Sequence, residues 1–133
     1  MRLFGDKISK DDAARLSAIT LAFVGDAVEH LFVRANLAQN KRDFETRSFS
    51  PIAANVVCAE AQADLAKKFL PLFTEEENYI YKRAKNARKR VKPKHATFAE
   101  YNAASGVEAV FGFLYLTGEY ERLEFLLSKV VEG

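Results

Sequence analysis

The sequence is poor in residues that crosslink a chain or interrupt its helices. Its 133 residues include one cysteine, three prolines, six glycines and no tryptophan. A single cysteine excludes an intramolecular disulfide and fits a reducing compartment. No apolar run is long enough to span a bilayer, because Glu108 interrupts the best candidate, residues 103–116. The charged residues Arg2 and Asp6 precede any apolar run, so we expect no signal peptide and a cytoplasmic protein.

The chain also lacks acid over one long stretch. Residues 79–98 contain eight lysines and arginines and no aspartate or glutamate. The whole chain has 20 basic and 18 acidic residues, so the remainder holds 12 basic against 18 acidic side chains. Positive charge concentrated in one segment is typical of a protein that binds a polyanion such as nucleic acid. The alternative is a solvated helix face paired with acids, and the segment itself provides no acid for such pairs.

Helix signals divide the rest of the sequence. An N-cap serine or threonine stands three residues before an acid at Ser9, Thr74 and Thr97, and Ser50 directly precedes Pro51. These signals predict helices that start near Ser9, run over about 17–37 and 51–69, start at Thr74, run from Thr97 to Gly118, and close the chain over 119–131. No convincing two-residue period appears. We therefore predict an all-α fold in a single domain over residues 1–133.

Two acids stand inside apolar stretches. Asp26 follows Gly25 within residues 21–28 (LAFVGDAV), and Glu108 lies within residues 106–116 (GVEAVFGFLYL). A carboxylate in so apolar a helix is costly unless it meets a cation, a metal ion or strong donors. Gly25 lowers helix stability by about 1 kcal/mol relative to alanine, which indicates a close backbone approach at that point.

Either acid alone is explained by an ion pair or a helix cap. Two such acids on separate helices can also face each other and hold a hard divalent cation such as Mg²⁺. A metal ion there would lower the pKa of a water molecule and stabilise charge on a phosphoryl oxygen. His30 shares a helix face with Asp26, and Glu29 and Glu60 lie on suitable helices, although their spacing requires no metal role.

The sequence motifs resemble a known family. Residues 21–28 resemble the signature helix of ribonuclease III domains, and residues 105–112 (SGVEAVFG) resemble the second acidic motif of that family. Residues 58–63, 83–87 and 92–96 resemble the small branch called Mini-ribonuclease III. The resemblance extends in one order over about residues 16–127.

The resemblance implies a ribonuclease III endonuclease-domain helical bundle and an Mg²⁺-dependent endoribonuclease that cuts double-stranded RNA to 5′-phosphate and 3′-hydroxyl ends. It implies a homodimer, a large-subunit (23S-type) ribosomal RNA precursor as substrate, and Asp26 and Glu108 as catalytic metal ligands. The family has two further acids, at the positions that Ala22 and Ser105 occupy here. With these replacements, the metal ion would have fewer direct protein ligands, and waters would complete its shell.

We expect no separate double-stranded-RNA-binding domain within the 133 residues, so the basic segment is the expected RNA-binding surface. The helix that starts at Thr74 should continue with Lys82, Lys85 and Lys89 along one face, and Pro93 should end it in a basic loop. Contacts to phosphates carry no base code, so RNA would be selected by shape. The expected RNA-binding residues are Lys82, Arg83, Lys85, Asn86, Arg88, Lys89, Lys92, Lys94 and His95.

Two other functions remain open at this point. The chain could be a ribonuclease III fold without chemistry that clamps structured RNA, which the replacements at Ala22 and Ser105 favour. It could also be a helix-turn-helix DNA-binding protein, although a uniformly basic helix suits base reading poorly.

Overall fold

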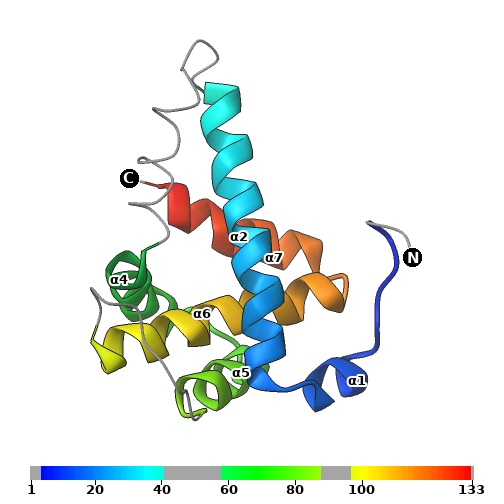
Figure 1. The fold of residues 1–133 in the computed structure, drawn as a ribbon. Helices are drawn as coiled ribbons and strands as arrows, with labels where there is room; N and C mark the ends of the chain where they lie inside the picture. The colour runs from blue at the N-terminus through cyan, green and yellow to red at the C-terminus, as the bar shows by residue number, and fades with distance from the viewer. Residues whose placement is uncertain (1–3, 41–57, 88–96, 133) are drawn as a thin grey trace.

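A computed structural model describes residues 4–40, 58–87 and 97–132, and within them it is helical without strands, which confirms the predicted all-α class. The helices wrap around one central element, as Figure 1 shows. They are α1 (Lys10–Arg15), α2 (Ala18–Asn40), α4 (Ala59–Phe69), α5 (Glu75–Lys85), α6 (Phe98–Leu116) and α7 (Tyr120–Val131).

Local capping fixes where three of these helices begin. Ser9 Oγ accepts a hydrogen bond from the Asp12 amide at 3.1 Å and caps α1. Thr74 and Thr97 each form a reciprocal capping box with the glutamate three residues on, which satisfies two backbone donors at the start of α5 and of α6. These helix starts were predicted correctly because capping depends only on residues a few positions apart. The predicted cap at Ser50-Pro51 lies outside the described residues.

Helix α6 is the core of the molecule. It is buried almost all round from Ala104 to Leu114, and α2, α4 and α5 all pack against it. Figure 1 shows α6 running across the upright α2. On the α4 side, the rings of Phe69 and Phe111 meet edge to face with centroids 6.1 Å apart. Because α6 is the common partner, its side chains are held from several directions at once.

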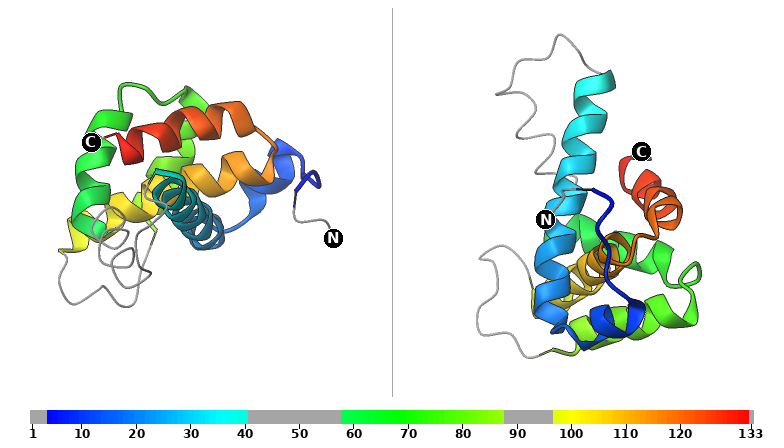
Figure 2. Two further views of the ribbon diagram at one scale, coloured as in Figure 1. Left: turned by 90° about the horizontal axis from the view of Figure 1, so that it is seen from above. Right: turned by 90° about the vertical axis from the view of Figure 1, so that its right-hand side faces the viewer.

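The C-terminal helix folds back beside α6, as the two views in Figure 2 show. Gly118 makes this turn in the left-handed region, at φ 76°, where a residue with a Cβ would be strained. Arg122 then ties α7 to α5: its Nε and Nη2 donate to the two carboxylate oxygens of the buried Glu77 at 2.9 and 2.8 Å. A third bond joins Nη2 to the Leu72 carbonyl at 2.7 Å.

Helix α5 is shorter than the sequence predicts. It ends at Lys85 with Asn86 as its C-cap, and the Ala87 amide donates to the Ala84 carbonyl at 3.3 Å. This bond spans three residues and replaces the four-residue spacing of the helix, and asparagine favours such ends because its side chain competes for backbone groups. The prediction that this helix continues to Lys89 is therefore wrong. Among the described helices, none is long and apolar enough to cross a membrane.

Candidate active site

Asp26 on α2 and Glu108 on α6 meet where these two helices cross. The crossing is close because Gly25 has no side chain: a Cβ there would overlap the carbonyl oxygen of Glu108. The close backbone approach predicted at Gly25 is thus present, and its partner is the backbone of α6. The side chains of Asp26 and Glu108 are joined by a hydrogen bond. The structure therefore brings together the two acids that the sequence predicted as a pair.

The surroundings of Glu108 disfavour the ionised form of its carboxyl group. Burial raises its pKa to about 10, and the hydrogen bond to Asp26 and the negative charges of Asp26 and Glu29 act in the same direction. The Glu108 carboxyl therefore carries a proton at neutral pH and donates it to Asp26. A proton held between two carboxyl groups marks a place where positive charge is favourable.

Asp26 is the solvent-exposed member of this pair. Its side chain is 55% exposed, and Oδ1 lies 3.3 Å from Nε2 of His30 one turn further along α2. The contact orients the Asp26 carboxylate from within its own helix. The Asp26 carboxylate is therefore accessible to solvent.

The residues present fit a hard cation held by few protein ligands. Two carboxyl groups that compete for one proton are suitable ligands for Mg²⁺, which keeps several waters of its own. Within the described ranges, no three side chains of histidine, cysteine, aspartate or glutamate are arranged to hold a metal ion together. The positions of the two further family acids are occupied by the half-buried Ala22 and the buried Ser105, which carry no carboxylate.

Glu29 and Glu60, the other acids near the predicted site, are placed very differently. Glu60 is exposed on α4. Glu29 is fully buried, accepts a hydrogen bond from Gln62 Nε2, and has its pKa raised to about 8, chiefly by burial. Sequence reasoning could not pair Glu29 with Gln62, since the two residues lie 33 positions apart on different helices.

The predicted RNA-binding residues divide into three groups. Lys82, Lys85 and Asn86 are exposed at the end of α5. Arg83 turns inward: its Nη1 and Nη2 donate to the carbonyls of Ala14 and Leu16 at 2.7 and 2.6 Å. The rest, namely Arg88, Lys89, Lys92, Lys94 and His95, lie outside the described residues. The geometry gives Arg83 a structural role between α5 and the junction of α1 with α2.

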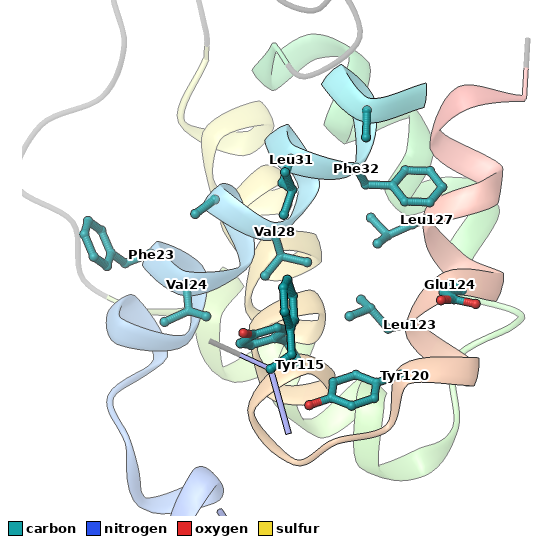
Figure 3. Close-up of a pocket in the computed structure, with 13 residues that line it drawn as sticks. Phe23, Val24, Val28, Leu31, Phe32, Tyr115, Tyr120, Leu123, Glu124 and Leu127 are labelled. Atoms are coloured by element: carbon teal, nitrogen blue, oxygen red, sulfur yellow. The ribbon is translucent and has the colours of Figure 1, made fainter. Parts of the chain in front are cut away.

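An apolar groove of about 700 Å³ lies between α2 and α7, as Figure 3 shows. Phe23, Ala27 and Leu31 line it at four-residue intervals, so a single face of α2 forms one wall. Leu123 and Leu127 of α7 lie opposite. Phe23 is 79% and Leu31 59% exposed, which is unusual for side chains of this size on one face.

Comparison with known proteins agrees with this geometry. The family model of the ribonuclease III domain matches residues 19–119, a span that contains both Asp26 and Glu108. The chain belongs to the ribonuclease III family. As a member of this family it is an endoribonuclease of the type that cuts double-stranded RNA.

Relatives and a solved structure cover nearly the whole of this ribonuclease III-family chain. It is 31% identical to the Mini-ribonuclease 3 of Clostridium tetani (strain Massachusetts / E88), over 96% of this chain and 84% of the relative. It is 35% identical to that of Thermoanaerobacter sp. (strain X514), over 94% and 87%. The crystal structure of a Fusobacterium nucleatum protein superposes with a TM-score of 0.81 at 31% identity, over 88% of this chain and 94% of that one. The resemblance stated from the motifs is confirmed.

Proposed function

We propose that this endoribonuclease depends on Mg²⁺ and that Asp26 and Glu108 are its metal ligands. The observation that carries the proposal is the meeting of these two side chains, joined by a hydrogen bond, at the crossing of α2 and α6. An Mg²⁺ ion bound there would lower the pKa of a water molecule and stabilise charge on a phosphoryl oxygen. Asp26 and Glu108 would hold it from two helices, and waters would complete its coordination.

The proposed reaction is hydrolysis of a phosphodiester. The oxygen of water forms a bond to phosphorus, the bond from phosphorus to the 3′ oxygen breaks, and that oxygen takes a proton. The products are a 5′-phosphate and a 3′-hydroxyl. The residues of this chain contribute by position: Glu108 is fixed in the core helix, while the exposed Asp26 faces the solvent from which RNA approaches.

Helix α5 supplies the described part of the proposed RNA contact. Lys82, Lys85 and Asn86 are exposed at its C-terminal end, within the basic stretch of residues 79–98. We propose that they, together with Arg88, Lys89, Lys92, Lys94 and His95, bind phosphates of the duplex. We leave Arg83 out of this set because both terminal nitrogens of its guanidinium are bonded to backbone carbonyls.

A homodimer is proposed from the apolar groove. Phe23 and Leu31 expose large apolar surface along one face of α2, and the groove between α2 and α7 is lined by similar side chains. A two-fold axis beside α2 would place this face against its own copy, which buries the same patch on both subunits. Two sites related by that axis could each cut one strand of a duplex.

The physiological substrate proposed is a precursor of large-subunit (23S-type) ribosomal RNA, processed in the cytoplasm. This proposal is supported by the similarity to proteins named Mini-ribonuclease 3 over most of both chains.

The test is a cleavage assay on a long RNA duplex, with Mg²⁺ and with a chelator. Asp26→Asn and Glu108→Gln should each slow cutting by at least about a hundredfold, equivalent to about 2.7 kcal/mol in the barrier, because each removes a ligand charge. Glu60→Gln is the matched control, since Glu60 is an exposed acid on α4 outside the pair. Gel shifts should show that all three variants still bind the duplex.

A second candidate is an RNA clamp without chemistry, favoured by Ala22 and Ser105 at the positions of the two further family acids. Tight duplex binding with no cutting in Mg²⁺, Mn²⁺ or Co²⁺ would support the clamp and contradict a metal-dependent nuclease.

A further inference from the structure

Glu29 and Gln62 form a buried polar pair beside the active site. The side chains are 0% and 1% exposed, and they join α2 to α4. Gln62 Nε2 donates to Glu29 Oε1. The second oxygen of each group, Glu29 Oε2 and Gln62 Oε1, is buried and has no hydrogen-bond partner.

The two orphaned atoms can satisfy each other only if one of them carries a proton. An ionised carboxylate is only an acceptor, and so is an amide oxygen. A buried acceptor without a donor destabilises the folded state, and this pair has two of them. If Glu29 Oε2 is protonated, it becomes a donor to Gln62 Oε1, and acid and amide close a ring of two hydrogen bonds.

The surroundings favour the same protonated form. Glu29 is three residues from Asp26 on its own helix, and it interacts electrostatically with Asp26 and with Glu108 of α6. Gln62, its partner on α4, is neutral. Burial and the charge of Asp26 raise the pKa of Glu29 to about 8, against the weaker opposing effect of the bond from Gln62.

We propose that Glu29 is a neutral positioning residue, held as a protonated acid in a two-hydrogen-bond pair with Gln62. The pair ties α4 to α2 and leaves two ionisable carboxyl groups, Asp26 and Glu108, for the cation. A third full negative charge next to them would change the affinity and number of bound metal ions. This consequence for the metal rests on the proposed function; the protonation of Glu29 does not.

Glu29→Gln is the decisive variant because its amide has the shape of the neutral acid. Its nitrogen can donate to Gln62 Oε1 and its oxygen can accept from Gln62 Nε2, so both bonds survive. Urea unfolding should be measured from pH 5 to 9 for this variant and the wild type. Because the pKa of Glu29 is raised in the folded state, wild-type stability from this group is present at low pH and is lost as pH rises through about 8. The unfolding equilibrium constants should therefore diverge in favour of the variant, by up to about tenfold per pH unit below pH 8, and then level off.

Infrared spectroscopy of the metal-free protein gives an independent readout. The wild type should show the carbonyl band of a protonated carboxylic acid at pH 7, and its difference spectrum against Glu29→Gln should isolate that band from any contribution of Glu108. In Gln62→Met the acid loses its acceptor, so the band should move to higher frequency. A band that Glu29→Gln leaves unchanged, or a Glu29→Gln variant that cannot fold although both bonds can form, would overturn the proposal.

Titration with Mg²⁺ alone separates this proposal from the proposed function. Glu29→Gln should bind Mg²⁺ within about threefold of the wild type, whereas Glu108→Gln should lose binding. Loss of Mg²⁺ affinity in Glu29→Gln would make Glu29 an ionised ligand and overturn its neutral role. If the wild type binds no metal and cuts no RNA, the proposed function fails, and the infrared band and the pH profile still decide the state of Glu29.

Discussion

Gly25 and Gly112 lie backbone against backbone at the crossing of α2 and α6. A Cβ on Gly25 would lie 2.8 Å from the amide nitrogen of Gly112, and a Cβ on Gly112 would lie 3.0 Å from the amide nitrogen of Gly25. Both hypothetical atoms would also overlap carbonyl oxygens of the facing helix. The separation of the two helices is therefore set by main-chain atoms, and the pairing of Asp26 with Glu108 depends on that separation.

Gly112→Ala should destabilise the protein and separate the two acids. In an ordinary helix interior this change stabilises by up to about 1 kcal/mol, because alanine is the better helix former. Here the new Cβ meets the Leu21 carbonyl, so we expect a loss of at least about 2 kcal/mol, as for other overpacked interiors. Urea denaturation measures the sign, and a stabilised variant would contradict the close crossing. Cleavage should fall with stability because the α2–α6 distance changes.

Arg83 should matter for stability more than for RNA. It donates two charged hydrogen bonds to carbonyls at the α1–α2 junction, and such bonds contribute about 1.5–3 kcal/mol each. Arg83→Lys keeps the charge but cannot span both carbonyls, so it should lower the free energy of unfolding by about 2 kcal/mol. A phosphate-binding role predicts the opposite result, in which Arg83→Lys folds like the wild type and retains most RNA affinity. Lys82→Met is the neighbouring control and should leave stability within about 0.5 kcal/mol.

Lys82 and Lys85 should instead change RNA binding and its dependence on salt. Each is exposed at the end of α5 and can neutralise one phosphate. Lys85→Gln should weaken binding to duplex RNA and reduce the slope of log affinity against log salt by about one unit per lost contact. Lys67→Gln, at an exposed position on α4, is the matched control and should leave the slope unchanged. An unchanged slope in Lys85→Gln would move the RNA path away from α5.

The sequence was a good guide wherever the determining contacts are local. The caps at Ser9, Thr74 and Thr97 bind amides three residues away, so a short window predicts them. The approach of α2 to another helix was predicted from Gly25 because a glycine inside an apolar helix costs stability without a compensating contact. The pairing of Asp26 with Glu108 was predicted because both acids stand inside apolar helices and because both lie in family motifs.

Contacts between residues far apart in the sequence could not be predicted from such local signals. Arg83 has its carbonyl partners 67 and 69 positions away, so its sequence neighbourhood suggests only another member of a basic run. Glu29 and Gln62 are similar, because nothing in an alanine-rich helix indicates which buried acid its glutamine will meet. The end of α5 at Lys85 was also not predicted, since lysine and arginine are good helix formers and the end of the helix depends on backbone bonds after Asn86.

Phe23→Asp should separate the proposed dimer. The ring is 79% exposed along the groove face of α2, so a charge there costs the free monomer little, whereas it would be desolvated in a two-fold interface. Light scattering after size exclusion should give twice the chain mass for the wild type and one chain mass for Phe23→Asp. Phe98→Asp, which changes an exposed phenylalanine outside the groove, should remain dimeric. A monomeric wild type at micromolar concentration would contradict this interface.

Mg²⁺ should stabilise the folded protein, and its affinity should rise with pH. A ligand at a hundred times its dissociation constant adds about 2.7 kcal/mol to the free energy of unfolding, so thermal unfolding with and without Mg²⁺ measures binding without RNA. The pKa of Glu108 is raised to about 10, so below that pH the metal must displace a proton, and affinity should increase up to about tenfold per pH unit. Calorimetry in two buffers of different ionisation enthalpy should detect the released proton. Asp26→Asn should abolish the stabilisation and Glu60→Gln should retain it. A dissociation constant that is the same at pH 6.5 and 8.5 would show that Glu108 is already ionised in the metal-free protein and that no proton is shared with Asp26.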